Sequence, residues 1–196
     1  MPDFFDVVRS QRGIRYYKPD SVPDEAVAQV LRAAVRAPSG GNKQPWRFIV
    51  IRDPEVKRQL GKLYLEGQGS RGSASPPPPQ GQPVPFSQAM DKVPVLIMAC
   101  MEKSQISRPV LGGASIYPAV QNLMLAAAAL GLGTRLTTVW HGRDEEVAKL
   151  LGIPEGYEAM ALVPLGYPQE PDHLGGSKRQ PISEVTFYDR WGNTKR

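Results

Sequence analysis

Cysteine and histidine are scarce in this sequence. Its 196 residues include one cysteine, Cys100, and two histidines, His141 and His173. One cysteine cannot form a disulfide within the chain, which favours a reducing compartment. Since Cys100 lies in the apolar run of residues 93–101, we expect a buried core thiol. The sequence has no cluster of Cys, His and Asp at metal-ligand spacing, so we expect no zinc or iron site.

Long apolar segments are also missing. The longest, residues 123–132, is far shorter than the roughly 20 residues that cross a bilayer. Residues 1–6 carry neither the basic start nor the apolar stretch of a signal peptide. We therefore expect a cytoplasmic protein that does not enter membranes.

The usual motifs of acid–base and nucleotide chemistry are absent too. The sequence has no Gly-x-Ser-x-Gly elbow and no Walker loop. Adjacent carboxylates occur at residues 144–146, where the first turn of a helix explains them better than catalysis does. This shortage of acid–base residues suggests that a bound cofactor supplies the chemistry.

The charge is modest and scattered. Lysine and arginine total 24 against 19 aspartate and glutamate residues, a net charge of +5. Nucleic-acid-binding domains concentrate such charge in runs or stripes, so we expect no nucleic-acid partner. A phosphorylated cofactor would also suit the excess. Hydrophobic residues make up 41%, which is ordinary for a globular protein, and the length suits a single domain over residues 1–196.

The hydrophobic pattern predicts a mixture of helices and strands. Apolar residues at helical spacing predict helices, and apolar runs bounded by turn residues predict strands. Asp53 and Pro54 form a strong helix start, an N-cap residue followed by proline. The expected helices cover residues 3–10, 24–36, 114–130 and 144–151, with one more from residue 54, and the expected strands cover 46–51, 93–101 and 157–165.

Two segments depart from this pattern. Residues 67–88 are rich in glycine, serine and glutamine and include four consecutive prolines, which cannot pair in a sheet or continue a helix. Such an excursion is either an ordered lid or a disordered loop. The tail, residues 180–196, is polar but carries Phe187, Tyr188 and Trp191. We expect this tail to dock on a partner.

Four short clusters could carry the chemistry, and each has a plainer explanation. Residues 9–15 hold three arginines that could clamp a phosphate or form a solvated basic face. Residues 37–46 combine glycines with amide side chains, which suits a flat ligand or an ordinary turn. Residues 131–138 expose backbone groups after a helix, or simply cap it. Residues 176–181 place two cations before the tail, as a ligand site or as surface charge.

Taken in this order, the four clusters resemble the nitroreductase family of flavoproteins. The most specific segment, residues 37–50, is similar to the family's Ala-Pro-Ser-x-x-Asn-x-Gln-Pro-Trp stretch. Residues 12–15 resemble its opening Arg-x-x-Arg signature, and residues 122–133 resemble its long dimer helix with the following glycine turn. Residues 178–181 resemble the closing basic-x-Pro motif. The resemblance runs from about Phe4 to Trp191, interrupted by the proline-rich excursion.

The resemblance implies a three-layer α+β fold, in which helices flank a mainly antiparallel central sheet. It implies an intertwined homodimer with two FMN sites, each built from both chains, and a tail that extends onto the partner's sheet. It also implies a hydride relay. NADH or NADPH would deliver hydride to flavin N5, and a small flat acceptor such as a nitroaromatic or a quinone would take the electrons. Positioning and electrostatics would then be the protein's contribution.

By the same resemblance, basic side chains would hold the phosphate end of FMN. Arg12 and Arg179 would bind the phosphate itself, with Lys178 beside them. Arg15 would sit between the phosphate and the pyrimidine end of the ring. There its charge would stabilise the negative reduced flavin.

The flavin ring would be held by the second cluster. Pro38, Ser39 and Gly40 would come from the partner chain's edge of the site. Asn42 would hydrogen-bond the polar edge of the ring, and Gln44 would lie close to it.

This chain departs from the family's pattern at two places. The backbone of Thr138 and Val139 would approach flavin N5, where relatives often carry Glu-Gly. A backbone donor survives that change, but a carboxylate does not. Gly13, in the phosphate-binding segment, stands where many relatives carry serine, and this removes a hydroxyl contact.

Two rival functions keep the flavin. One is another reaction of the same superfamily, such as dehalogenation, dehydrogenation or cleavage of the flavin itself. The other is a flavin-binding or storage protein without catalysis. A basic DNA-associated protein is a third rival, which the scattered charge disfavours.

Overall fold

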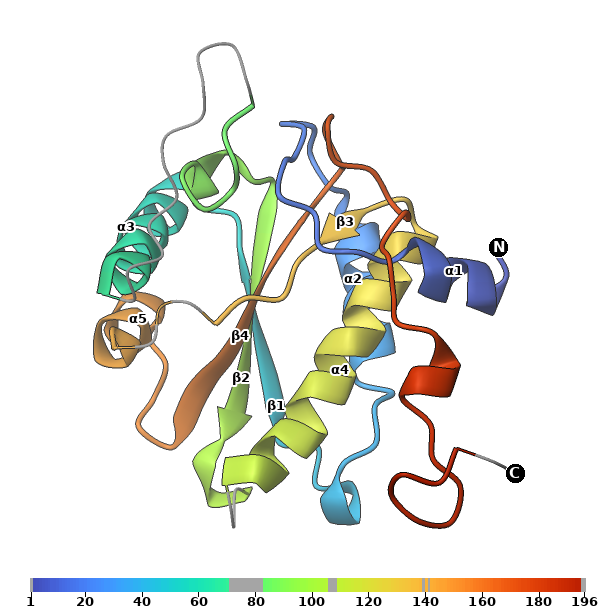
Figure 1. Ribbon diagram of the computed structural model, residues 1–196. Helices are drawn as coiled ribbons and strands as arrows, with labels where there is room; N and C mark the ends of the chain where they lie inside the picture. Colours follow the sequence, from blue (N-terminus) through green and yellow to red (C-terminus); the bar gives the residue numbers. More distant parts are fainter. Residues whose placement is uncertain (1, 71–82, 106–108, 139, 141, 195–196) are drawn as a thin grey trace.

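A computed structural model describes residues 2–70, 83–105, 109–138, 140 and 142–194 of the protein (Figure 1). At its centre is an antiparallel sheet with the strand order β1-β2-β4-β3. The predicted α+β class and the mainly antiparallel sheet are thus confirmed. The strands are Trp46–Ile51 (β1), Val95–Glu102 (β2), Gly133–Thr134 (β3) and Tyr157–Gly166 (β4).

Helices cover both faces of the sheet, which gives three layers. Figure 1 shows α2 and α4 on one face and α3 and α5 on the other, and each pair is in contact. The described α-helices are α1 (Phe4–Ser10), α2 (Asp24–Ala34), α3 (Pro54–Ser70), α4 (Pro109–Ala129) and α5 (Asp144–Leu151). Short 3-10 helices are η1 (Gly40–Asn42), η2 (Met90–Lys92), η3 (Lys103–Gln105) and η4 (Ile182–Glu184).

Strand β2 is buried on both faces, as its unbroken apolar sequence predicts. Its side chains alternate between two cores. Val95 and Ile97 join the core under α2 and α4, whereas Leu96 and Cys100 join the core under α3 and α5. Cys100 is 2% exposed, and burial raises the pKa of its thiol to about 11. The predicted core thiol is therefore confirmed.

Helix α4 carries apolar residues nearly all round, as predicted for a buried helix. Ile116, Val120 and Leu123 are fully buried in the core that α4 shares with α2 and the sheet. Within the described residues, none of the helices combines the length and apolar character needed to span a membrane.

Helix α3 is longer than its sequence predicts. The sequence favours an excursion over residues 67–88, but the helix continues through two glycines to Ser70. Leu60 and Tyr64 are buried on its inner face, and this packing outweighs a cost of about 1 kcal/mol for each helical glycine. Residues 71–82 of the predicted excursion lie outside the described part of the chain.

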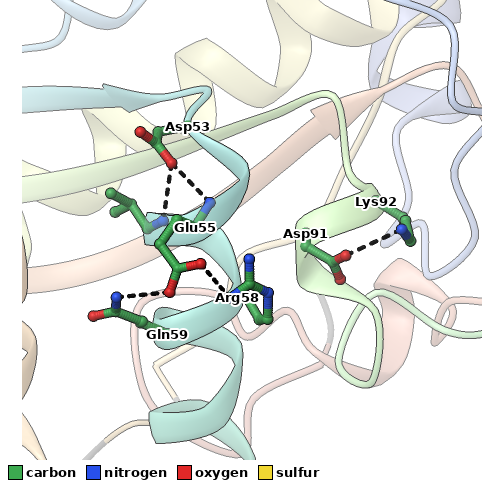
Figure 2. Close-up of polar contacts among 7 residues, drawn as sticks. Asp53, Glu55, Arg58, Gln59, Asp91 and Lys92 are labelled. Atoms are coloured by element: carbon green, nitrogen blue, oxygen red, sulfur yellow. Dashed lines mark hydrogen bonds and ion pairs between the residues drawn. The ribbon is translucent and has the colours of Figure 1, made fainter.

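Asp53 caps the start of α3, as predicted. Its carboxylate accepts hydrogen bonds from the backbone N–H groups of Glu55 (2.7 Å) and Val56 (3.2 Å). Figure 2 shows this cap next to the Glu55 carboxylate, which accepts a bond from Gln59 (2.9 Å) and pairs with Arg58. The bonds from Gln59 and Arg58 lower the pKa of Glu55. Side chains therefore satisfy the first turn of the helix.

We expect Asp53→Ala to lower the free energy of unfolding by about 1 kcal/mol, because two helix-start N–H groups lose their acceptor. Urea unfolding followed by circular dichroism measures this change. Asp53→Ser is the control, since a serine oxygen can still cap the helix and should restore most of the loss. Equal stability of Asp53→Ala and the wild type would contradict the capping role.

Candidate functional site

The N-terminal arm, residues 11–18, crosses the sheet edge beside β3. Gly13 forms a parallel bridge with Thr134, and the Ile14 N–H donates to the Thr134 carbonyl (2.9 Å). The arm thus lies against the sheet without forming a strand of its own, and it carries Arg12 and Arg15 to this end of the sheet.

Tyr17 supports the arm from within the core. Its hydroxyl donates to the Ile14 carbonyl (2.9 Å). Burial raises the pKa of the Tyr17 phenol well above its usual value of 10.0, so the hydroxyl stays protonated and remains a donor. Among nearby charges, Arg135 and Arg15 act to lower this pKa and Asp172 acts to raise it. These three charged groups therefore surround the phenol.

The backbone of Arg15 is held on both sides. Its N–H donates to the carboxylate of Asp172, and its carbonyl accepts from the Phe86 N–H (2.8 Å). Tyr16 is held in the same way, by Asp172 at its N–H (3.3 Å) and by Gln169 at its carbonyl (3.0 Å). Arg15 is exposed, so its cation extends from a fixed backbone toward the surface.

Arg135, one residue after β3, adds a third cation beside the arm. Its guanidinium lies 5.7 Å from the centre of the Phe86 ring, within cation–π range. The aliphatic part of the Arg135 side chain lies beside Gly13, because a Cβ on Gly13 would be 3.7 Å from Arg135 Cγ.

The start of the arm meets a segment from the far end of the chain. The Gly175 N–H donates to the Ser10 carbonyl, and Arg12 Nη1 donates to the Gly175 carbonyl (3.1 Å). These contacts join two distant segments, since Arg12 and Gly175 are 163 residues apart in the sequence.

Gly176 leaves room beside Arg12. It has a positive φ of 75°, and a Cβ on it would lie 3.9 Å from Arg12 Nη1. Lys178 and Arg179 follow within three residues, and both are exposed. The Arg12–Gly175 contact therefore brings Arg12 to the start of the segment that carries Lys178 and Arg179.

The second predicted cluster lies around η1, before β1. The Gln44 N–H donates to Ser39 Oγ (3.0 Å), and Pro38 and Gly40 are exposed. Asn42 and Gln44 have positive φ values of 54° and 49°. Such values are costly for residues with a side chain and gather at functional sites.

Within one chain, these two clusters lie at opposite ends of the sheet (Figure 1). Trp46, which follows the η1 cluster, pairs with Met101, whereas Val95 at the other end of β2 pairs with Leu165, the partner of Thr134. At a rise of about 3.3 Å per residue, the six steps along β2 separate the two ends by about 20 Å. One chain therefore does not bring its two clusters together.

Thr138 follows β3 by four residues and lies beside the middle of β4, next to Thr137. The preceding Thr137 exchanges backbone hydrogen bonds with Leu162, and its hydroxyl is bonded to the buried Tyr64 hydroxyl (2.9 Å). Thr138 thus leaves an anchored segment and is itself half-buried. Val139 lies outside the described residues.

Sequence reasoning missed the residues that hold the N-terminal arm in place. Asp172 and Phe86 contact it from distant parts of the chain, and neither stands in a motif that signals this role. Within the described residues, no group of three or more His, Cys, Asp or Glu side chains could hold a metal ion.

Comparisons with known proteins agree with this geometry. A family model described as the nitroreductase family matches residues 8–167. The chain is 31% identical over 195 residues to an NADH dehydrogenase from Thermus thermophilus, covering 91% of this chain and 92% of that protein. It is 29% identical over 177 residues to an iodotyrosine deiodinase from Thermotoga neapolitana, covering 87% and 91%.

A solved structure has the same fold. It is a protein from Desulfovibrio desulfuricans, assigned as a nitroreductase and determined in complex with FMN. The TM-score is 0.73 at 26% identity, and the match covers 97% of this chain and 99% of that one.

We expect Tyr17→Phe to lower the free energy of unfolding by about 1–2 kcal/mol, because the Ile14 carbonyl would lose its hydroxyl donor. Urea denaturation measures the loss. Tyr188→Phe is the matched control, since Tyr188 is 36% exposed and its change should leave stability within about 0.5 kcal/mol. If both variants behave alike, Tyr17 does not support the arm in this way.

Proposed function

The chain belongs to the nitroreductase family, and we propose that it is an FMN-dependent oxidoreductase. It takes NADH or NADPH as the hydride donor and reduces a small flat acceptor, such as a nitroaromatic or a quinone. FMN, when bound, supplies the redox chemistry, because its ring accepts hydride and passes electrons on. The protein's own residues bind and orient the reactants, and residues 1–196 act as one domain.

One observation carries this proposal. The hydrogen bond from Arg12 to Gly175 brings the start of the chain to the segment that holds Lys178 and Arg179. Guanidinium and ammonium groups are the donors that bind a phosphate best, and this contact places three of them on adjoining segments. We call Arg12, Arg15, Lys178 and Arg179 the basic edge. The family match and this basic edge point to the same cofactor.

The shape of the edge also fits a phosphate. Gly176 has no side chain that would fill the space beside Arg12, and Gly13 has none that would contact Arg135. At both glycines the backbone can therefore approach a ligand closely. One N–H of the Arg12 guanidinium donates to Gly175, and its other N–H groups can bind the ligand. We assign phosphate binding to Arg12 and Arg179, with Lys178 assisting and Gly13 in close contact.

Arg15 serves the ring rather than the phosphate. Its backbone is fixed and its cation is exposed, so it can offset negative charge that develops on the pyrimidine side of the ring. Thr138 and Val139 would offer backbone groups toward N5. This division of roles remains part of the proposal.

A second copy of the chain completes the site. Pro38, Ser39, Gly40, Asn42 and Gln44 lie before the end of β1 that is opposite to Arg12, and the two ends of the neighbouring β2 are about 20 Å apart by its strand rise. A homodimer that pairs one chain's basic edge with the partner's η1 cluster would join them.

Exposed apolar side chains support the same dimer. Phe4 and Phe5 of α1 are 64% and 66% exposed, and Ile182 and Trp191 of the tail are 80% and 91% exposed. Phe4 contacts Phe5 and Phe187 contacts Trp191, and such exposed apolar pairs are typical of contacts with other chains. We propose that the tail docks on the partner.

Reductive dehalogenation is a second candidate, favoured by the similarity to an iodotyrosine deiodinase at 29% identity. It uses the same cofactor and the same basic edge. The two activities differ in the acceptor alone, so an assay with 3-iodotyrosine beside a nitroaromatic and a quinone distinguishes them.

The first experiment is an absorbance spectrum of the protein after incubation with FMN, followed by anaerobic NADH or NADPH. We expect a flavin spectrum that bleaches on adding the donor and returns on adding the acceptor. Bound flavin that never bleaches would favour a storage protein. A protein that binds no FMN would overturn the proposal.

A complementation experiment tests the shared site. Arg12→Ala with Arg179→Ala disables the basic edge, and Asn42→Ala with Gln44→Ala disables the η1 cluster. Each double variant alone should bind FMN poorly. Co-expression should restore about a quarter of the sites, because half of a random dimer population is mixed and each mixed dimer holds one intact site.

The control for this experiment is co-expression of two different basic-edge variants, which should restore nothing. If sites lay within single chains, the first mixture would restore nothing either, and the shared site would be wrong.

A further inference from the structure

We propose that Asp172 is the positioning residue of the flavin site, acting through Arg15. This inference rests on the proposed function, since Arg15 is there assigned to the flavin ring. Asp172 lies in the segment between β4 and the C-terminal tail, and its side chain is directed at the N-terminal arm.

The contacts of Asp172 are unusual for a surface loop. The residue is 8% exposed, and its Oδ2 accepts hydrogen bonds from two successive backbone N–H groups, those of Arg15 and Tyr16. Burying a carboxylate is costly unless hydrogen bonds or opposite charges compensate it. Here two backbone donors supply the hydrogen bonds that compensate the burial of the Asp172 carboxylate.

The arm needs such an anchor. Around Arg15 the arm is not paired with a strand by a regular series of hydrogen bonds. Its isolated β-bridges lie at Gly13 and Tyr17. Between these bridges, the N–H of Arg15 depends on Asp172 alone among the contacts described. Asp172 therefore decides where the Arg15 backbone sits and where its cation can reach.

Asp172 also links the two halves of the basic edge. Its own N–H donates to the Gln169 carbonyl (3.0 Å), and the chain runs on from Asp172 to Gly175, which accepts the bond from Arg12. Asp172 thus acts together with the Arg12–Gly175 and Gly175–Ser10 hydrogen bonds in tying the N-terminal arm to the segment after β4. Of these contacts, the bond to Asp172 is the one that holds Arg15.

Charge and position predict opposite effects on the flavin. If Asp172 acted through its own negative charge, removing that charge would raise the midpoint potential of bound FMN. If it positions Arg15, losing the hydrogen bonds would lower the potential, because a cation beside the reduced ring would be misplaced. Asp172→Asn removes the charge but keeps an oxygen acceptor, whereas Asp172→Ala removes both.

The experiment measures the FMN dissociation constant, by quenching of flavin fluorescence, and the midpoint potential of bound FMN. We expect Asp172→Ala to weaken FMN binding about tenfold and to lower the potential, as Arg15→Gln does. Asp172→Asn should stay close to the wild type in both. The double variant Asp172→Ala with Arg15→Gln should be no worse than Arg15→Gln alone, because the two act through one contact.

Controls separate this role from a loss of fold. Asp20→Ala removes an exposed carboxylate, with the same change in net charge, and should alter neither quantity. Circular dichroism and urea unfolding check that Asp172→Ala is folded under the assay conditions. If Asp172→Ala does not fold, the same measurements are made on Asp172→Asn and Asp172→Ser, each alone and combined with Arg15→Gln.

Three results would overturn the inference while the wild type still binds FMN. They are a raised potential in both Asp172 variants, an unchanged dissociation constant in Asp172→Ala, or additive effects in the double variant. A wild type that binds no FMN would instead reject the proposed function.

Discussion

The burial of β2 on both faces is the constraint from which the rest of the architecture follows. Its alternate side chains enter two separate cores, so helices must cover the sheet on either side. With β2 fixed in this way, β1 and β4 pair along its two edges, and the chain segments before β1 and around β3 are held at opposite ends. The distance between the two predicted ligand-binding clusters is therefore a property of the core.

The basic edge depends on contacts of a different kind. Around Arg12 and Arg15 the chain is irregular, and its backbone groups bond to partners from β3, from Phe86 and from the segment after β4. A flexible loop could carry the same arginines, but ligand binding would then have to order the loop, which costs conformational entropy. Tertiary hydrogen bonds remove that cost in advance, and this is the sense in which the site is preorganised.

Sequence patterns predicted the regular elements well because local physics decides them. Strand β1 and helix α5 match their predicted ranges, the cap at Asp53 is formed, and Cys100 is buried. The prediction was wrong at the end of α3, where packing of Leu60 and Tyr64 keeps glycine-containing turns helical. The site residues came from motifs and resemblance, which named Arg12 and Asn42 but could not reveal Asp172, since no local pattern marks a carboxylate that bonds a backbone 157 residues away.

The sequence by itself determined the family, the order of helices and strands, the buried centre of the sheet and the types of residue available for a phosphate and a flat ring. These follow from periodicity, turn chemistry and motif spacing, which act over a few residues. Only the tertiary structure decided that Arg12 meets Gly175, that Asp172 holds Arg15, and that the η1 cluster lies far from both. Such relations depend on how the sheet and its two layers of helices pack, because long-range contacts arise from the whole core and not from any one segment.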